Sequence, residues 1–455
     1  MEKFLGLPPV ASQHGVEVDN LIIIIHYLMF ALFIGWGTFY AYTLIRFRKS
    51  KHPKADYTGV KSHLSSYIEI AVALFEVALL ALFSIPMWTR RVDAFPAENS
   101  ATVVRIVAEQ FAWNIHYPGP DGKFGRTSPD LVSSDNPLGL DRTDPDAKDD
   151  ITTINQLNIP VGKPVIVHLS SKDVIHSFNL PVMRTKQDAI PGLNIPLWFT
   201  PTKTTDEIRQ SLIKTINISH FIQTVETVSI PPEQDFAVTG SSNESYILTE
   251  AVNDTSGASI LSVNDILNKD NVKLLMDNQI KSVKVREVSH IDKYVAAENY
   301  VGKDGTAIVS KGDQMSEDAA TKLLKMGTTE VKVRPPSNLD TFLSMQQYKD
   351  NSGNVIVDVN GFIDDPTIDK LVAAGINDIT IAPSTPTEIA CAQLCGLGHY
   401  RMRGYMTIMT QQDYDKWVAD QEASLQPPPA DTTTTPTPTD TTKVSASPTT
   451  QETAH

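Results

Sequence analysis

Two long apolar stretches dominate the hydrophobic pattern near the N-terminus. Residues 21–45 are almost entirely apolar, with His26 as the only strongly polar member, and residues 67–88 form a second run interrupted by two glutamates. A helix needs about 20 apolar residues to cross a bilayer, and both runs are long enough. The pattern therefore predicts a transmembrane helix hairpin within residues 1–95.

The loop between the two apolar runs is rich in Lys and Arg. Short basic loops stay in the cytoplasm, so both ends of the hairpin, and the whole chain after Trp88, are expected on the extracytoplasmic side. Residues 1–20 lack the basic, apolar and small-residue regions of a cleavable signal peptide. The basic residues of this loop are Arg46, Arg48, Lys49, Lys51, Lys54 and Lys61.

Beyond residue 95 the pattern changes to short runs rich in β-branched residues. Val103–Trp113 and Pro164–Leu169 partly alternate between apolar and polar positions and are bounded by Pro and Gly. Such runs are typical of β-strands. We therefore expect β-structure in residues 96–204.

A sequence repeat follows this β-region. Glycine, aromatic, serine and β-branched residues recur at a constant spacing of 48 residues. The segments 241–288, 289–336 and 337–384 therefore align with one another without gaps. Self-similarity at a fixed period indicates a repeat architecture. The related sets are Gly257, Gly305 and Gly353; Tyr246, Tyr294 and Phe342; Ser241, Ser289 and Ser337; Val283, Val331 and Ile379; and Val285, Val333 and Ile381.

Each unit is predicted to fold in the same way. An aromatic-bearing stretch leads to Asp/Gly turn residues, an apolar strand such as Val355–Val357, a short helix and a closing strand. Ser316 is a candidate N-cap of the second helix, and Asp365 before Pro366 begins the third. One unit buries too little to be stable alone, so we expect the three to pack as an α+β module, residues 205–384, inserted at a surface hairpin.

Composition and charge fit a mostly soluble domain on a membrane anchor. The chain has 455 residues, a net charge of −14 and 41% hydrophobic residues. After Leu425 it turns to Pro, Thr, Ser and Ala, which cannot form a core, so residues 426–455 are expected to be disordered. The Cys-x-x-Cys-His pattern of haem attachment does not occur there, so the sequence predicts no fused cytochrome c domain.

The residues with the most specific chemistry lie shortly before this tail. Cys391, Cys395, His399 and Met402 follow one another at spacings of four, four and three residues, and these cysteines are the only two in the chain. Sulfur and imidazole donors suit copper, zinc or iron–sulfur sites, and a Cys/His/Met mixture favours copper. Another histidine, His176, lies far upstream.

Several interpretations of these residues remain open from their chemistry alone. A disulfide between Cys391 and Cys395 would require two nearby side chains to converge across three residues. A structural zinc site would leave Met402 unused, and a one-copper blue site takes only one thiolate. A dinuclear copper centre uses both thiols, because each thiolate can bridge both metals.

At these residues the chain resembles cytochrome c oxidase subunit II, in which C-x3-C-x3-H-x2-M and an upstream His build the dinuclear copper A centre. The resemblance implies that both thiolates bridge the copper ions and that each imidazole binds one. Met402 would complete one copper, and a backbone carbonyl the other. A centre with a full ligand set has no open position for substrate and passes electrons only. The implied ligands are His176, Cys391, the carbonyl of Gln393, Cys395, His399 and Met402.

The resemblance covers residues 1–204 and 385–420. It implies a cupredoxin-type all-β sandwich, formed by residues 96–204 and 385–425 and interrupted by the repeat module. Many family members carry Glu at the position of Gln393, where its side chain also serves a magnesium site, and this chain departs from that pattern.

The resemblance also implies roles for residues outside the ligand set. Phe111 takes the place of the family's electron-accepting Trp, and Trp113 aligns with a second aromatic residue. Asp173 and Asp188 are candidates for donor docking or the subunit interface, since an acidic domain would steer a basic cytochrome c. Glu69, seventeen residues before a proline, matches a family Glu at the entrance of a proton path in subunit I.

The implied function is that of subunit II of a respiratory haem–copper oxidase, a proton-translocating cytochrome-c oxidase. The chain would accept electrons from a c-type cytochrome and pass them to haem in subunit I, without an oxygen-reducing site of its own. Expected partners are oxidase subunits I and III and the electron donor, with no nucleic acid. The expected location is a bacterial-type inner membrane, with the copper domain in the periplasm.

Other proteins share parts of the pattern. A quinol oxidase subunit II has this fold but typically lacks the ligands, and nitrous oxide reductase shares the copper motif but not the two-helix anchor. A membrane-tethered copper-binding or copper-delivery protein is the alternative from a different class, because it would hold one reversible copper ion. The module shows no metal, phosphate or nucleophile pattern. We expect it to dock a further respiratory component, or else to shield or stabilise the domain.

Overall fold

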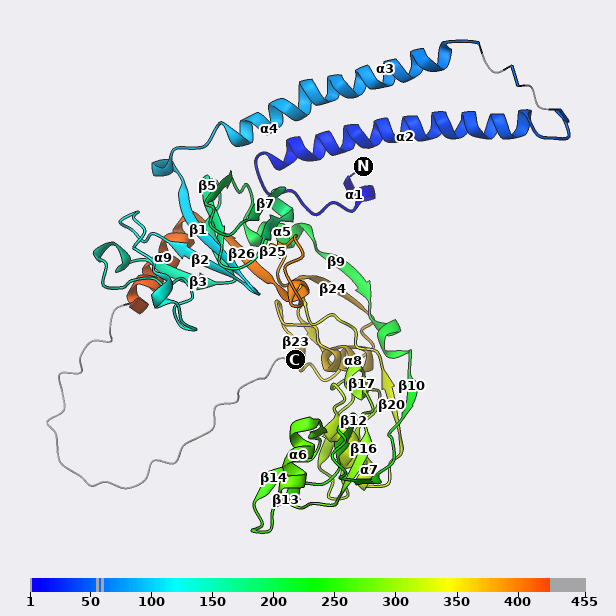
Figure 1. Ribbon diagram of the computed structural model, residues 1–455, viewed down its shortest axis with the longest axis vertical. Coiled ribbons are helices and arrows are strands. Elements are labelled where there is room, and N and C mark those ends of the chain that lie inside the picture. Colours follow the sequence, from blue (N-terminus) through cyan, green and yellow to red (C-terminus); the bar gives the residue numbers. More distant parts are fainter. Residues whose placement is uncertain (1, 55–56, 59–60, 426–455) are drawn as a thin grey trace. The chain divides into compact units, whose positions relative to one another are not determined.

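The computed structural model describes residues 2–54, 57–58 and 61–425 (Figure 1). The segment 426–455, predicted to be disordered, lies outside these residues. The chain divides into two compact units. One unit contains residues 1–117 and 152–414, and the other contains residues 118–151 together with the residues from Asp415 onward.

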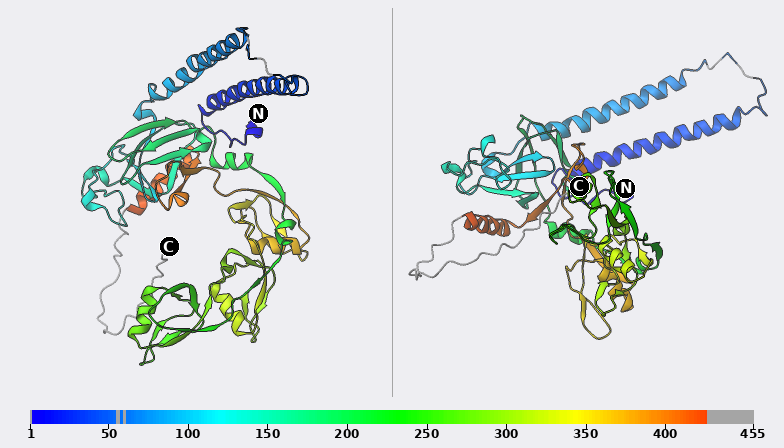
Figure 2. Two further views of the ribbon diagram at one scale, coloured as in Figure 1. Left: turned by 45° about the vertical axis from the view of Figure 1, so that its right-hand side comes forward. Right: turned by 60° about the horizontal axis from the view of Figure 1, so that its bottom comes forward.

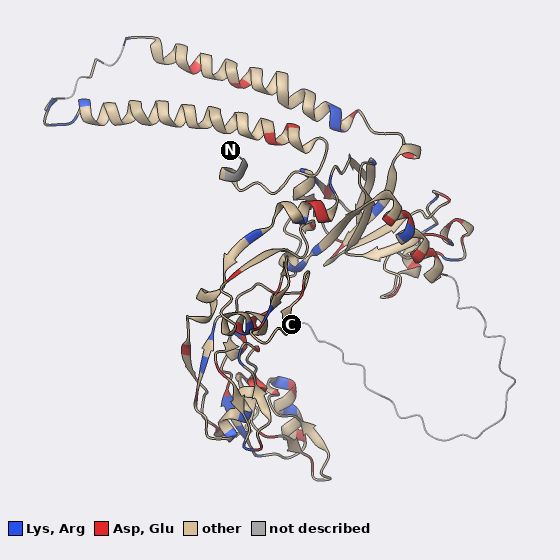
Figure 3. Ribbon diagram, turned by 180° about the vertical axis from the view of Figure 1, so that it is seen from behind, with Lys and Arg blue, Asp and Glu red and all other residues tan. Residues whose placement is uncertain are grey.

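Two helices are long and apolar enough to cross a membrane (Figure 3). The second contains a π-helical segment, Leu80–Ser84, which ends two residues before Pro86. Proline lacks the N–H that an α-helix needs and crowds the carbonyl four residues earlier, so the turn widens by one residue. The helix then continues past its predicted end at Trp88. The elements are α1 (Glu2–Leu5), α2 (Gly15–Arg46), α3 (Leu64–Leu79) and α4 (Ile85–Val92).

The segment before α2 is held by the β-domain that follows the membrane helices. The N–H of Ala11 donates to the carbonyl of Val182, and the N–H of Gln13 donates to that of Thr200. Arg184 and Asp19 form a two-pronged ion pair with N–O distances of 2.6 and 3.0 Å, and both side chains are shielded from solvent. These contacts fix the start of α2 on the domain, although the sequence assigned no role to this segment.

His14 is a buried histidine in this segment, with Nε2 3.1 Å from the hydroxyl of Thr185. Burial, together with the nearby charge of Arg91, lowers the pKa of His14 from 6.5 to about 4. The unfolded chain therefore takes up a proton near pH 6.5 that the folded chain excludes. Stability is expected to fall by up to ~3 kcal/mol as the pH drops from 6.5 to 4, and then to level off.

Thermal unfolding of the detergent-solubilised protein between pH 7 and pH 4 measures this effect. His14→Gln should flatten the pH dependence, whereas the exposed control His220→Gln should leave it unchanged. An equally steep pH dependence in His14→Gln would contradict the assignment.

The β-domain consists of two five-stranded sheets. Trp113 and Phe178, one from each sheet, are fully buried and contact each other edge to face at 5.5 Å. The predicted strand Val103–Trp113 is a hairpin of two strands joined at Gln110 and Phe111. One sheet has the order β3 (Ile151–Ile154), β2 (Ala112–Tyr117), β1 (Thr102–Glu109), β5 (Val165–Ser171) and β8 (Ile195–Phe199). The other has the order β4 (Gln156–Pro160), β26 (Arg403–Met409), β25 (Glu388–Cys391), β6 (His176–Leu180) and β7 (Thr185–Ala189).

A short helix, α5 (Thr205–Ser211), connects this domain to the inserted segment. A capping box of Thr204 and Glu207 begins the helix and satisfies its first N–H groups. The hydroxyl of Thr205 accepts a hydrogen bond of 2.9 Å from the N–H of Ile408 on β26. The predicted start of the module at residue 205 thus falls on a helix that is bound to the β-domain.

The three predicted units, here called repeats 1, 2 and 3, contain equivalent elements. Each has a first strand, a β-hairpin, a helix and a closing strand. Repeat 1 has β12 (Asn243–Leu248), β13 (Val252–Asn253), β14 (Ser259–Leu261), β15 (Ile266–Leu267), α6 (Lys269–Asp277) and β16 (Ser282–Glu287). Repeat 2 has β17 (Val295–Ala296), β18 (Tyr300–Val301), β19 (Ala307–Val309), α7 (Glu317–Lys325) and β20 (Glu330–Arg334). Repeat 3 has β21 (Phe342–Ser344), β22 (Tyr348–Lys349), β23 (Val355–Val357), α8 (Asp365–Ala373) and β24 (Asp378–Pro383).

The caps of these helices agree only in part with the caps predicted from the sequence. Ser316 caps α7, because its side chain accepts a hydrogen bond from the N–H of Ala319, as predicted. The cap of α8 is Asp364, one residue before the predicted Asp365. Asp365 is instead the first helical residue.

The chain completes each repeat with a strand that it forms before the first repeat begins (Figures 1 and 2). β9 (Lys214–Asn217) pairs with the closing strand of repeat 3, β10 (Glu226–Ser229) with that of repeat 2, and β11 (Gln234–Ala237) with that of repeat 1. All three pairings are antiparallel. They share one register, in which the equivalent partners are Ile216 and Ile379, Val228 and Val331, and Phe236 and Val283.

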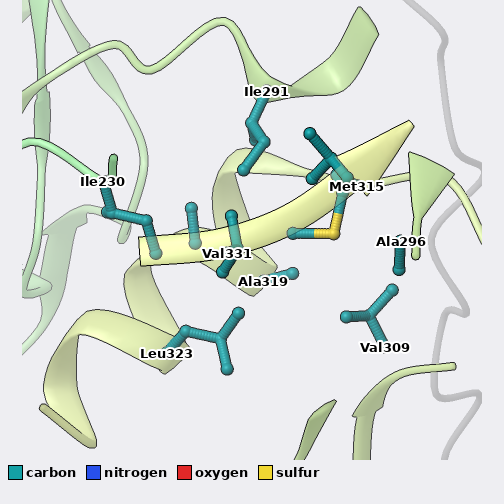
Figure 4. Close-up of a cluster of buried hydrophobic side chains, with 10 residues drawn as sticks. Ile230, Ile291, Ala296, Val309, Met315, Ala319, Leu323 and Val331 are labelled. Atoms are coloured by element: carbon teal, nitrogen blue, oxygen red, sulfur yellow. The ribbon is translucent and has the colours of Figure 1, made fainter. Parts of the chain in front are cut away.

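Each repeat has its own apolar core, whereas the sequence suggested that three units would have to pack together. The segment 214–240, which carries β9, β10 and β11, is here called the outgoing segment. In repeat 2, its residue Ile230 lies beside Val331, with Leu323 of α7 and Met315 nearby (Figure 4). Ile218 contributes in the same way to repeat 3. The outgoing segment adds the apolar surface that a single unit lacks.

A buried arginine joins repeat 1 to repeat 2. The guanidinium of Arg286 on β16 is fully buried, 2.7 Å from the carboxylate of Glu317 and 2.9 Å from the hydroxyl of Thr321 on α7. The hydroxyl of Thr321 donates in turn to the side chain of Asn264 in repeat 1. A charge is stable in such a place only when it is paired and hydrogen-bonded.

The same contact recurs one repeat later, between repeats 2 and 3. Arg334 on β20 pairs with Asp365 and Asp369 on α8, with 2.8 Å between Nη2 and the Asp369 carboxylate. Repeat 3 has Ala382 at the position of the arginine, and repeat 1 has Lys269 at the position of its first carboxylate partner. The two ends of the array therefore lack the groups that join its members.

Residues 118–151 belong to the second compact unit. Arg142 donates from Nη1 to the carbonyls of Ala147, at 2.7 Å, and Asp150, at 2.9 Å. The carboxylate of Asp150 accepts from the N–H of Gly125 at 2.8 Å. These bonds hold together a segment that has little regular secondary structure. The second unit also includes part of α9 (Gln411–Leu425).

Candidate metal centre

Three neighbouring strands bring the predicted ligands together. β25 lies between β6 and β26 and ends at Cys391, which is paired with Phe178 on β6. His176 is the first residue of β6, and Met402 directly precedes β26. The pairing of β25 with β6 thus closes a sequence separation of 215 residues.

The donor atoms fall into two groups around the pair of thiols. The sulfurs of Cys391 and Cys395 lie 3.7 Å apart. Cys391 Sγ is 3.9 Å from Nδ1 of His176 and 3.2 Å from the carbonyl oxygen of Gln393. Cys395 Sγ is 3.5 Å from Nδ1 of His399 and 3.8 Å from Sδ of Met402.

The spacing of the two thiols suits binding of a metal ion by both sulfurs. Metal–sulfur bonds in proteins are about 2.3 Å long. Two sulfurs that lie 3.7 Å apart can therefore both bind the same ion. Each sulfur has a different imidazole beside it, and each has one further weak donor. In a disulfide the two sulfurs would be at covalent distance, whereas both of these cysteines are free.

The centre is partly closed to solvent. His176, Cys395 and Met402 are buried, Cys391 and His399 are half-buried, and Gln393 is exposed. Burial, together with the Cys391 thiol, raises the pKa of Cys395 to about 11. A metal ion must therefore displace the Cys395 proton, since thiols bind metals as thiolates.

Comparison with known proteins places this chain in a family. Residues 102–206 match the family described as cytochrome C oxidase subunit II, periplasmic domain. The alternative cytochrome c oxidase subunit 2 of Bradyrhizobium diazoefficiens is 34% identical over 197 residues, which cover 43% of this chain and 69% of that protein. The chain belongs to the cytochrome c oxidase subunit II family.

Two further relatives match parts of this chain. Cytochrome c oxidase subunit 2 of Cereibacter sphaeroides is 25% identical over 209 residues, covering 43% of this chain and 66% of that protein. The crystal structure of the periplasmic domain of subunit II from Bradyrhizobium japonicum is 27% identical, covering 27% of this chain and 72% of that one, with a TM-score of 0.16. The chain thus spans about two thirds of the length of these curated relatives.

Membership in the subunit II family has direct consequences. The chain is part of a haem–copper oxidoreductase, acts together with other oxidase subunits, and has a role in electron transfer. The family implies copper binding, which agrees with the donor set of Cys, His and Met. The two apolar helices and the match to a periplasmic domain indicate a membrane-anchored protein with its β-domain in the periplasm.

Asp173 contacts the predicted ligand His176. Its carboxylate lies 2.9 Å from Nε2 of His176 and accepts from the N–H groups of Gln110 and Val174. Burial opposes ionisation, but these hydrogen bonds outweigh it and lower the pKa of Asp173. A carboxylate on the far nitrogen of a ligating imidazole fixes the tautomer and the ring orientation.

Asp173→Asn is expected to weaken copper binding by about 10–100-fold, since the oriented carboxylate would be lost. Copper affinity, measured by competition with a chelator of known affinity, checks this value. Asp188→Asn is the matched control, because Asp188 is half-buried on the neighbouring strand β7 and pairs through its backbone with Ser177. Equal affinities of the two variants would contradict the positioning role.

The two aromatic candidates occupy different environments. Phe111 is 36% exposed, and its ring lies against the backbone at Gly396 and Gly398, between the predicted ligands Cys395 and His399. Trp113 is fully buried, with its ring 6.2 Å from the ring of His176. Phe111 therefore reaches the surface, whereas Trp113 belongs to the core.

Two further positions lie outside the ligand set. Glu69 is in the second turn of α3 and is exposed in the isolated chain. Gln110 was not predicted, although its side chain contacts the ligand loop. No short motif marks a glutamine as a hydrogen-bond partner of a metal loop, so only its place beside Phe111 could have drawn attention to it.

Proposed function

We propose that this chain is subunit II of a respiratory haem–copper oxidase and holds a dinuclear copper A centre. It would accept electrons from a c-type cytochrome and pass them to haem in subunit I. The observation that carries this proposal is the thiol pair, 3.7 Å apart, in which each sulfur lies beside a different imidazole.

In this function the protein would hold the ligand atoms in fixed positions and keep water away from the metal. When bound, the paired copper ions supply a one-electron carrier. The strand pairing of β25 with β6 and β26 fixes the thiols relative to His176, and Asp173 holds the imidazole ring. Both thiols are used as ligands in this proposal, so neither serves as a nucleophile toward a substrate.

Copper content separates the proposed function from that of a copper-delivery protein. The full-length protein, purified in detergent and loaded with copper, is expected to hold two copper ions per chain and to give a mixed-valence electron paramagnetic resonance spectrum. A single labile ion without that spectrum would overturn the proposal and support copper delivery.

We propose Phe111 as the point at which electrons enter. Phe111→Ala is expected to weaken donor binding about tenfold, because exposed aromatic residues at the centre of an interface often contribute about 1–2 kcal/mol. Rapid-mixing measurements with a reduced c-type cytochrome test this result. Phe95→Ala is the control, since Phe95 is 37% exposed and packs against Trp198 instead. Unchanged donor kinetics in Phe111→Ala would exclude the role.

The remaining partners follow from the proposed assembly. Subunits I and III would surround the helix hairpin in a bacterial-type inner membrane, and oxygen reduction coupled to proton translocation would belong to the assembly. Glu69 on α3 would lie at the entrance of the proton path of subunit I. Purification of the intact complex, followed by identification of its subunits, tests this composition.

We also propose that the three repeats dock a further respiratory component. Within the described residues, the one cluster of His, Cys, Asp and Glu suited to a metal is His176, Cys391 and Cys395, outside the repeats. We therefore expect the repeats to provide a binding surface for a protein and not a metal site.

The pairing of β9 with β24 supplies the cut points for a variant without the repeats. Lys214 at the start of β9 pairs with Ile381 on β24. Partners in an antiparallel ladder lie about 5 Å apart, so two glycines can replace residues 214–381. α5 is kept because Thr205 bonds to β26. Lower turnover with unchanged copper content supports docking, and unchanged copper content, assembly and turnover would exclude a required docking role.

A further inference from the structure

Gln110 is hydrogen-bonded to both segments that carry the ligands, although it belongs to neither. It lies in the turn between β1 and β2. Its side-chain Nε2 donates to the carbonyl of Cys395 at 2.6 Å. Its main-chain N–H donates to the Asp173 carboxylate at 2.7 Å, and the other oxygen of that carboxylate contacts His176.

The loop between Cys391 and Met402 is attached mainly at its two ends. Its start is bound to β6, where the N–H of Ala392 donates to the carbonyl of Ser177, and its end continues into β26. Leu394 and Leu397 are 78% and 98% exposed, so they do not anchor the loop. The bond from Gln110 ties the middle of the loop to the turn of the other sheet.

The local backbone leaves room for this contact only because two loop residues are glycines. Gly396 has a φ of +134°, and a Cβ at this position would lie 2.7 Å from Nε2 of Gln110. A Cβ at Gly398 would lie 2.3 Å from the ring of Phe111. The dipeptide Gln110–Phe111 therefore packs directly on the backbone between Cys395 and His399.

We propose that Gln110 is a positioning residue that holds His176 and Cys395 in register before copper binds. The inference rests on the proposed dinuclear centre and extends it to a residue outside the ligand set. The ligand loop that begins at Cys391 comes from one side of the insertion, and His176 comes from the other. Gln110 joins the two sides through one side-chain bond and one main-chain bond.

The amide of Gln110 suits this task because it is an uncharged donor of fixed length. Glutamate has the same shape but offers only acceptor oxygens at neutral pH, so it would face the Cys395 carbonyl with an unpaired acceptor. Gln110→Glu therefore removes the bond without removing the side-chain volume, and Gln110→Ala removes both. Gln156→Ala, an exposed position on β4, is the matched control.

The first measurement uses the full-length, metal-free protein. Hydrogen–deuterium exchange of the segment 392–401 is expected to be about tenfold faster in both Gln110 variants, since the middle of the loop opens more often when its hydrogen bond to Gln110 is lost. Exchange of the β26 peptide should stay unchanged in all variants. Rates within twofold of the wild type in both variants would overturn the proposal.

The second measurement uses the copper-loaded protein. Loss of copper to a chelator is expected to be about 10–100-fold faster in both variants, and the hyperfine pattern of the mixed-valence spectrum should change, as for other residues that orient metal ligands. Wild-type release rates and spectra in both variants would overturn the proposal. If the wild type itself holds no copper pair, the proposed function fails, while the exchange measurement still reports on Gln110.

Discussion

Replacing Cys395 with Ser is expected to reduce the bound copper from two ions per chain to at most one and to abolish the mixed-valence spectrum. A hydroxyl is a poor ligand for copper compared with a thiolate, which is soft and polarisable. Cys395 is also the donor next to both His399 and Met402, so its loss removes the link between these ligands and Cys391. Elemental analysis and electron paramagnetic resonance of the purified protein measure the effect.

Ser177→Ala is the control for this substitution. Ser177 is buried next to His176, and its Oγ has no hydrogen-bond partner among the residues that the structure describes, so the change should leave the copper content unaltered. Cys391→Ser should behave like Cys395→Ser, because the two sulfurs share the same role. Two copper ions in either cysteine variant would contradict the bridging arrangement.

Replacing Arg334 with Ala is expected to destabilise the contact between repeats 2 and 3 by about 3–5 kcal/mol, which is the usual cost of breaking a buried ion pair from one side. The substitution leaves the carboxylates of Asp365 and Asp369 in a mostly buried place without their main partner. Hydrogen–deuterium exchange of α8 and β24 should therefore become faster by two orders of magnitude or more.

Lys332→Ala is the matched control on the same strand. Lys332 forms an exposed ion pair with Glu298. Such pairs contribute about 0–1 kcal/mol. Exchange of α8 should therefore remain close to the wild-type rate in this variant. If Arg334→Ala and Lys332→Ala had the same small effect, the arginine would not join the repeats.

The sequence was most informative at the metal centre, where chemistry restricts residue types. Four donors lie close together in the sequence, and the structure brings His176 to them through the pairing of β25 with β6. Asp173 was predicted only as a docking or interface residue, because sequence spacing does not show which way a carboxylate points. Its contact with His176 depends on the conformation of the turn before β6, which residue spacing does not specify.

The inserted segment was predictable where it repeats and unpredictable where it does not. The fixed period marked the three units because equivalent positions carry equivalent residues. β9, β10 and β11 are each only four residues long, and the spacing between them is irregular, so neither length nor period identified them. The contacts at the start of α2 were also missed, since they consist of backbone hydrogen bonds of Ala11 and Gln13 and of one ion pair between Arg184 and Asp19 in the helix.

The position of β9, β10 and β11 before the first repeat limits how this insertion could have changed in evolution. Tandem duplication of one repeat would add a closing strand, such as β20. It would not add the strand that pairs with it from before the first repeat, as β10 pairs with β20. The new member would expose a sheet edge and lack part of its core. A fourth repeat would therefore also require an additional strand in the segment upstream of residue 241. The number of repeats is thus constrained at two separate places in the gene.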